Sequence, residues 1–210
     1  MLEVKSFSFN PFFENTYVVF NEKKEAIVID PGMSNAREEE IFSKFIADQK
    51  LNLIQMVNTH CHIDHILGVS YVNQIYELPL YFHPNEQPIW DMAIPTAQMY
   101  SLNYKHTNAI YHLINHKKLH LGEDTIELRY TPGHSPGSIS FYCPDGRWAI
   151  VGDTLFKQSI GRTDLPMGNH NLLINSIKDQ LFSLPSETKI YSGHGEETQI
   201  EFEQKTNPFF

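Results

Sequence analysis

Short runs rich in β-branched and aromatic residues open the chain, at 4–9, 15–20 and 26–30. Runs of this length and composition predict strands, and the polar stretches between them predict a meander that enters a sheet. The tripeptide Asp30-Pro31-Gly32 is a strong turn signal and ends the third strand. The chain therefore begins as a β-sheet.

Helical spacing follows immediately over 36–49. Apolar residues recur there on one stripe of a helix, namely Ile41, Phe42, Phe45 and Ile46. Acidic residues gather in the first turn, where the helix dipole favours negative charge. The segment is predicted to be an amphipathic helix that packs its apolar stripe against the sheet.

A second strand-to-helix unit contains the most polar loop of the chain. The apolar run 53–59 predicts a buried strand, and 66–76 returns to helical spacing before a short strand at 78–83. Between them lies the loop 60–65, which therefore sits at the carboxyl end of a buried strand.

The segment 84–118 is less regular, because prolines interrupt its apolar pattern. It predicts broken helices over the sheet. Four large side chains there are candidates to line a pocket, with burial in the core as the alternative: Trp90, Met99, Tyr100 and Tyr104.

The rest of the chain repeats the same style. Strands are predicted at 125–131, 138–143, 148–153 and 189–192, with a helix over 171–182. Two strand-rich halves that each carry helices predict an α/β fold of the αββα sandwich type. In that fold two mixed sheets pack face to face and helices cover the outer faces. We expect 1–210 to form a single domain.

Charge and cysteine content limit the classes of binding partner and the cellular compartment that we expect for this protein. The 16 basic and 25 acidic residues leave a net charge of −9, which argues against nucleic acid or an anionic membrane surface as a partner. No run approaches a membrane span. With two cysteines, Cys61 and Cys143, and no secretory pattern at the amino terminus, we expect a cytoplasmic protein whose cysteines are packing residues.

Eleven histidines are many for this chain, and their spacing suggests a use for some of them. The loop 60–65 contains four potential ligands: His60, His62, Asp64 and His65. His60 and His62 can point to one side, while the other two lie at the start of a helix. This arrangement suits two adjacent metal ions better than one. The alternative is a polar loop with coincidental histidines.

Three further candidates follow predicted strands, at His134, Asp153 and His194. Strand ends with neighbouring glycines are common positions for ligands. Each residue alone is a weak signal, because a histidine after a strand is more often an ordinary surface residue. The other six histidines show no ligand pattern: His83, His106, His112, His116, His120 and His170.

Taken in order, these motifs resemble a known family. The sequences THCHIDH at 59–65, TPGHSPGS at 131–138, GDTLF at 152–156 and SGHG at 192–195 resemble the metallo-β-lactamase fold metallohydrolases. The similarity is greatest to the small glyoxalase II-like, or hydroxyacylglutathione hydrolase-like, branch. Segments 14–17, 29–32, 159–164 and 207–209 also resemble that branch, so the likeness covers almost the whole chain.

The resemblance implies a binuclear metal site with two divalent ions, zinc in the first place and iron or manganese as alternatives. One ion would be held by His60, His62 and His134, and the other by Asp64, His65 and His194, with Asp153 bridging both. Such a set leaves coordination positions for a bridging hydroxide and a substrate.

The resemblance further implies a reaction, the hydrolysis of a small-molecule thioester such as a hydroxyacylglutathione by a metal-bridging hydroxide. Asp64 and Asp153 would be the catalytic carboxylates, with Asp64 also orienting the hydroxide. Arg162 resembles a position that contacts a substrate carboxylate. An internal pair between Arg162 and Asp164 is the alternative.

Other readings of the same residues stay open. A persulfide dioxygenase would use a single iron with His60, His134 and Asp153. Lactone or ester hydrolysis needs the same hydroxide, and a purely structural metal site is a further alternative. We expect no separate C-terminal helical domain of the kind that binds glutathione in glyoxalase II. The sequence predicts no particular oligomer.

Overall fold

A computed structural model describes residues 2–113 and 117–210, and the chain divides into two compact units. The first unit comprises the described part of Met1–Ile114 together with His120–Asp124. The second comprises Thr125–Phe210 and the described part of Asn115–Leu119. The single domain expected from the sequence stays a prediction.

The sheet of the first unit has the strand order β1-β2-β3-β4-β5-β6. Its strands are β1 (Glu3–Phe9), β2 (Glu14–Phe20), β3 (Glu25–Ile29), β4 (Asn52–Val57), β5 (Leu80–Phe82) and β6 (Ile110–His112). The first three pair antiparallel and the last four pair parallel, so the sheet is mixed. Neighbouring residues such as Val18 and Val19 are both fully buried, because the central strands are covered on both faces.

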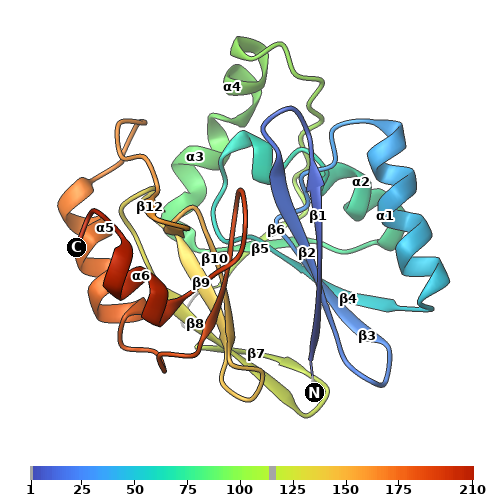
Figure 1. Cartoon of the computed structure of the whole chain (residues 1–210). Helices are drawn as coiled ribbons and strands as arrows, with labels where there is room; N and C mark the ends of the chain where they lie inside the picture. The colour runs from blue at the N-terminus through green and yellow to red at the C-terminus, as the bar shows by residue number, and fades with distance from the viewer. Residues whose placement is uncertain (1, 114–116) are drawn as a thin grey trace. The chain divides into compact units, whose positions relative to one another are not determined.

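Two helices lie next to each other beside this sheet, α1 (Ala36–Asp48) and α2 (Val69–Tyr76) (Figure 1). The side chain of Asn35 caps α1 by accepting hydrogen bonds from two backbone N–H groups of the first turn. Phe42 and Ile46 are buried, as predicted, whereas Ile41 is 44% exposed. The prediction for Ile41 is wrong because one residue along a helix rotates the side chain by about 100°, away from the sheet.

The segment after β5 forms broken helices, as predicted. A 3₁₀ turn η2 (Pro84–Glu86) leads into α3 (Gln87–Asp91) and α4 (Ala93–Met99). Trp90 is buried and stacks on Phe82 with ring centroids 5.6 Å apart. Tyr104 also packs against this core, whereas Met99 is 79% exposed. Of the two alternatives for Trp90, burial in the core is therefore the one that the structure shows. The strand β6 was not predicted.

A second six-stranded sheet has the strand order β14-β13-β10-β9-β8-β7, and there is also a two-stranded ribbon, β11-β12. The strands are β7 (Lys118–Leu121), β8 (Asp124–Tyr130), β9 (Ile139–Cys143), β10 (Trp148–Gly152), β11 (Leu155–Phe156), β12 (Ser159–Ile160), β13 (Lys189–Ser192) and β14 (Thr198–Gln199). Strand β10 pairs parallel with β13 and antiparallel with β9, so this sheet is also mixed. Two mixed sheets with helices confirm the predicted α/β class.

Helices α5 (His170–Ser176) and α6 (Ile200–Thr206) belong to the second unit (Figure 1). A π-helical turn η3 (Ile177–Leu181) continues α5. Leu173, Ile177 and Leu181 are fully buried and pack with apolar residues of the sheet. Across the described parts of the chain, we find no helix with the length and apolar character needed to cross a membrane.

Candidate metal centre

The histidine-rich loop of the first unit follows strand β4 and ends in a 3₁₀ turn η1 (Ile63–His65). His60 and His65 are fully buried. The ring of His60 lies 4.8 Å from that of His62 and 4.1 Å from that of His65, measured between centroids. The structure thus gathers these three predicted ligands in one cluster.

Asp30 supports this cluster, a role that the sequence analysis missed. Its Oδ1 accepts the backbone N–H of Thr59 at 2.6 Å, and its Oδ2 accepts the Thr59 hydroxyl at 2.6 Å. The same Oδ2 lies 3.0 Å from Nδ1 of His65. Asp30 has a φ of 53°, an uncommon backbone conformation that these hydrogen bonds hold in place. The available signal was an aspartate directly after a buried strand.

The hydrogen bonds at Nδ1 decide which imidazole nitrogens can bind a metal. The Thr59 hydroxyl donates to Asp30, so it accepts from Nδ1 of His60 at 3.0 Å. Nδ1 of His65 is likewise held by Asp30. A metal-ligating histidine characteristically donates its other ring N–H to an oxygen in this manner. Nε2 is therefore the ligating atom available on both His60 and His65.

Two side chains, those of Asn58 and Glu86, hold the backbone of the loop. Nδ2 of Asn58 donates to the carbonyls of both His60 and His65, at 2.9 and 2.8 Å. Oε2 of the buried Glu86 accepts the backbone N–H of Cys61 at 2.8 Å. Because these bonds involve backbone groups on both sides of the turn, they fix the directions in which the ligand side chains leave it.

Asp64 is held through its own backbone. Nδ2 of Asn10 donates to the carbonyl of Asp64 at 3.0 Å and to that of Gly32 at 2.9 Å. Its carboxylate oxygen Oδ2 lies 3.7 Å from Nε2 of His65. The two predicted ligands of the 3₁₀ turn thus present their donor atoms to the same space.

Glu14 is a second buried carboxyl behind the loop. Its Oε2 accepts the Thr16 hydroxyl at 2.9 Å, and its Oε1 lies 3.8 Å from Nδ1 of His65. Burial raises the pKa of Glu14 well above its ordinary value. Burial likewise raises the pKa of the Cys61 thiol, which favours the neutral form. Cys61 and Cys143 are both buried, as predicted for packing residues.

The second unit forms its own cluster from His134, Asp153 and His194. Oδ2 of Asp153 lies 3.5 Å from Nε2 of His134 and 3.6 Å from Nε2 of His194. Nδ1 of His134 lies 2.8 Å from the carbonyl oxygen of Arg162 and donates to it, which leaves Nε2 for a metal. One carboxylate oxygen thus lies near both imidazoles.

Two glycines allow this cluster to form. Gly133 has a φ of 136°, and a Cβ there would lie 2.3 Å from the backbone nitrogen of Leu173 in α5. The backbone N–H of Asn169 donates to the Gly133 carbonyl at 2.7 Å. A Cβ at Gly161 would lie 1.8 Å from the carbonyl oxygen of Asp153. Each glycine thus lets backbone approach directly beside a predicted ligand.

Arg162 forms the internal pair that the sequence left as an alternative. Its Nε and Nη2 donate to the two carboxylate oxygens of Asp164, each at 2.8 Å. This hydrogen bonding lowers the pKa of Asp164 from 3.8 to about 2. Both side chains are exposed, so the pair is accessible to a ligand. A role of Arg162 in substrate binding stays a prediction.

The remaining histidines have other surroundings. Nε2 of His112 lies 2.7 Å from Oε1 of Gln87, and the ring of His106 lies 4.7 Å from that of Trp90. His83 caps the turn η2. His116 lies outside the described residues. The other predicted pocket residue, Tyr100, is exposed and meets the ring of Phe12 edge-on at 5.4 Å.

The seven predicted ligands thus form two sets, four in the first unit and three in the second. Imidazole nitrogens and carboxylate oxygens together suit a divalent ion such as zinc, iron or manganese. In the first unit, Asp30, His60 and His65 all offer atoms within 4.8 Å of one another. Asp30 already binds Thr59 and His65, so we assign it to orienting these side chains.

Sequence comparison identifies related proteins over nearly the whole chain. The probable metallo-hydrolase YqgX of Bacillus subtilis is 35% identical over 201 residues, which cover 95% of this chain and 93% of that protein. The hydroxyacylglutathione hydrolase GloC of Haemophilus influenzae is 31% identical over 201 residues, with coverage of 94% and 93%.

Solved structures agree with the sequence comparison. The BLEG-1 B3 metallo-beta-lactamase has a TM-score of 0.90 and 36% identity, with 99% of both chains covered. TTHA1623, solved in a di-iron-bound form, has a TM-score of 0.87 and 32% identity, with 98% of this chain and all of that chain covered. The predicted fold is thereby confirmed. The family model of the metallo-beta-lactamase superfamily matches residues 9–194, and the chain belongs to this superfamily.

Proposed function

We propose that this metallo-hydrolase relative cleaves the thioester of an acylated thiol, such as a hydroxyacylglutathione. The proposal assigns both ligand sets to one pair of divalent ions. One ion would bind His60, His62 and His134, and the other Asp64, His65 and His194. Asp153 would bridge the two ions.

The observation that carries the proposal is the position of Asp153. Its Oδ2 lies between the Nε2 atoms of His134 and His194, at 3.5 and 3.6 Å. These two histidines are assigned to different ions, so a carboxylate between them suits a bridging ligand. The orientation of His60, His65 and His134 through Nδ1 also supports the assignment.

Bound divalent ions would lower the pKa of coordinated water and polarise a substrate carbonyl. Asp64 would orient such a water. Its carboxylate is partly exposed and its Oδ2 lies 3.7 Å from Nε2 of His65, which supports this role. A thiol leaving group has a pKa near ~8.5, so it departs as thiolate without a protein acid. The 31% identity to GloC supports a thioester as the substrate.

Arg162 is proposed to contact a carboxylate of the substrate. Its guanidinium is exposed and already adopts a forked geometry on Asp164. A substrate carboxylate can exchange with Asp164 in the same geometry.

The proposal is tested by measuring bound zinc, iron and manganese and assaying the same preparation with lactoylglutathione. Release of free thiol that is lost in His60→Ala and in Asp153→Asn supports hydrolysis at this site. Turnover no greater than that of His60→Ala would overturn it.

Two other activities are outcomes of the same experiment. The 36% identity to BLEG-1 makes a β-lactam a necessary comparison substrate. Ring opening of a β-lactam without thioester turnover would replace the proposed substrate. If the protein binds one iron per chain and consumes oxygen with glutathione persulfide, the proposed reaction is wrong and the protein is an oxygenase. If it cleaves only a lactone, the proposed substrate is wrong and the protein is an ester hydrolase.

A further inference from the structure

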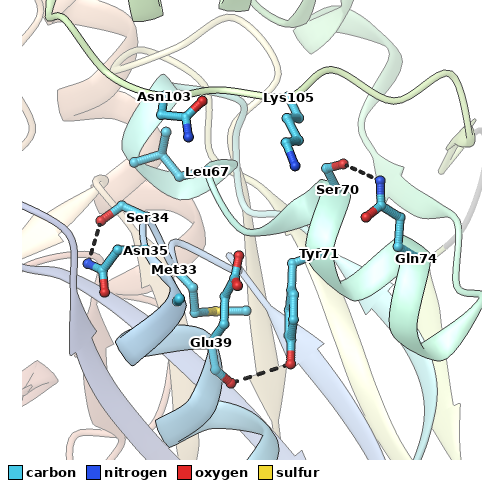
Figure 2. A pocket seen from close by; sticks show the side chains of 11 residues that line it. Met33, Ser34, Asn35, Glu39, Leu67, Ser70, Tyr71, Gln74, Asn103 and Lys105 are labelled. Carbon is cyan, nitrogen blue, oxygen red and sulfur yellow. Dashed lines mark hydrogen bonds between the residues drawn. The ribbon is translucent and has the colours of Figure 1, made fainter.

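The first unit contains a polar pocket of about 300 Å³ that the metal ligands do not line. It lies between the start of α1, helix α2 and the segment after α4 (Figure 2). This volume is at the lower end of the range for small-molecule sites. It can therefore hold a small headgroup but not a large ligand.

Two opposite charges point into this pocket from different elements. Figure 2 shows the Lys105 side chain directed inward from the segment after α4, and the Glu39 carboxylate directed inward from α1. Among the described residues, no ion pair joins these two groups. The pocket thus presents a separate cation and a separate anion, which match a ligand with a carboxylate and an ammonium group.

The walls of the pocket are held in place. The Tyr71 hydroxyl donates to the backbone carbonyl of Glu39 at 3.5 Å, which ties the α2 wall to the α1 wall. Met33 and Leu67 are buried and form an apolar surface. The amide of Asn103 adds a hydrogen-bonding group. The pocket thus combines fixed polar groups with an apolar floor, as ligand sites do.

One residue of the pocket floor, Leu67, is close in sequence to the loop that holds Asp64 and His65. Leu67 follows His65 by two residues, so their Cα atoms are at most about 7 Å apart. The backbone N–H of Gly68 donates to the carbonyl of Pro31 at 2.8 Å, which joins the two segments behind the floor. A γ-glutamylcysteine unit spans roughly 10 Å when extended, about three residues of chain. The inference below requires a ligand of that length to extend from this pocket to the loop.

We infer that this pocket binds the zwitterionic α-amino-acid headgroup of a γ-glutamyl thiol, with the ligand carboxylate at Lys105 and its ammonium at Glu39. This inference rests on the proposed thioester hydrolysis and names the thiol part of the substrate. It also assigns a headgroup site to this chain.

The experiment is calorimetric titration of the full, metal-loaded protein with S-methylglutathione, which contains no thioester. We expect binding that weakens about fivefold in Lys105→Met and in Glu39→Gln, because each removes one partly exposed charge contact. The control Lys44→Met removes an exposed lysine of helix α1, which pairs with Asp48 and does not line the pocket. The affinity of this variant should equal that of the wild type. Acetylation of the α-amino group of S-methylglutathione removes the ammonium charge. The wild type should therefore bind this acetylated ligand about as weakly as Glu39→Gln binds unmodified S-methylglutathione.

Absence of binding to the wild type overturns the inference, and so does equal affinity of the wild type and Lys105→Met. Equal binding of the acetylated ligand overturns the role of Glu39. Hydrolysis of S-lactoyl-N-acetylcysteamine, a thioester without the headgroup, separates this inference from the proposed function. That neutral substrate should be cleaved equally by the wild type and Lys105→Met, and its failure to react with either would count against the proposed function alone.

Discussion

The carboxylate of Glu86 accepts the backbone N–H of Cys61 at 2.8 Å, although 25 residues separate them in sequence. Cys61 lies between His60 and His62, and Glu86 is fully buried. A buried carboxylate thus holds the backbone N–H of the one residue between two predicted ligands.

Replacing Glu86 by alanine leaves a buried N–H group without its acceptor, which costs about 1–3 kcal/mol of unfolding free energy. The loop also loses a constraint, and outer contacts of this kind change metal affinity by about 10–100-fold. We expect Glu86→Ala to weaken metal binding in a chelator competition, whereas Glu86→Gln keeps an acceptor and stays near the wild type.

A matched control is Glu203→Ala in the second unit. Glu203 is also fully buried and accepts the backbone N–H of Gln158 at 2.9 Å. The Glu203→Ala substitution should lower the unfolding free energy measured in urea without a comparable loss of metal affinity. Equal losses of affinity in both alanine variants would contradict a specific role for Glu86.

Substitution of Gly161 should be far more costly than its size suggests. A Cβ there would lie 1.8 Å from the carbonyl oxygen of Asp153, so the backbone beside a predicted ligand must move. We expect Gly161→Ala to lower the unfolding free energy by more than about 3 kcal/mol, as overpacking against rigid backbone does. Urea unfolding followed by tryptophan fluorescence measures the loss.

The control for this prediction is Gly195→Ala. Gly195 has a φ of 73°, and a Cβ there would meet nothing within 4 Å. Its substitution should cost only the conformational strain of about 1 kcal/mol. If the two alanine variants are equally stable, the close approach at Gly161 is not a constraint.

The pair of Arg162 and Asp164 predicts opposite effects for its two members. Removing the guanidinium in Arg162→Ala should raise the pKa of Asp164 from about 2 toward 3.8, as followed by NMR titration. Asp164→Asn frees the guanidinium for a substrate carboxylate. We therefore expect a lower KM for an anionic thioester in Asp164→Asn and a higher KM in Arg162→Ala. An unchanged KM in both variants would leave Arg162 as a surface residue.

Glu14 predicts a dependence of stability on pH. Burial raises its pKa in the folded protein, so its contribution is complete below the unfolded pKa near 4.5 and is lost as pH rises toward the folded value. Glu14→Gln is neutral at every pH. We expect the unfolding free energy of Glu14→Gln, relative to the wild type, to increase between pH 5 and pH 8.

The slope of that difference is at most about 1.4 kcal/mol per pH unit, the value for one proton. Urea titrations of chelator-treated protein at several pH values measure it. A difference that does not change with pH would show that burial leaves Glu14 ionised.

The sequence was sufficient for the elements whose apolar pattern is long. Strands β1 to β3, helix α1 and the strands β8 to β10 lie where the pattern predicted them. It was insufficient for β6, β7, β11, β12, β14 and α6. The five missed strands have only two to four residues, too few to establish an alternation, and α6 has seven, which is only about two helical turns. Their position depends on neighbours that are distant in sequence.

For the candidate site, motif spacing located the histidines but not their support. Asp30, Glu14 and Glu86 are acidic residues without a recognisable spacing to the loop, yet all three are buried beside it. Which carboxylate reaches which backbone or ring nitrogen depends on the packing of separate segments. Only the folded coordinates contain that information.

The π-helical turn after α5 gives the second unit an unusual intolerance to changes in chain length. Leu173, Ile177 and Leu181 recur every four residues, a spacing that drifts by about 40° per step around a regular α-helix. The wider turn offsets that drift and keeps the row against the sheet. Leu173 is also the residue that lies against Gly133, next to His134. Deleting one residue within Ile177–Leu181 would restore the pitch of a regular α-helix, but it would also rotate the helical residues that follow the deletion. Insertions and deletions made to engineer the protein should therefore avoid this helix and be placed in surface turns.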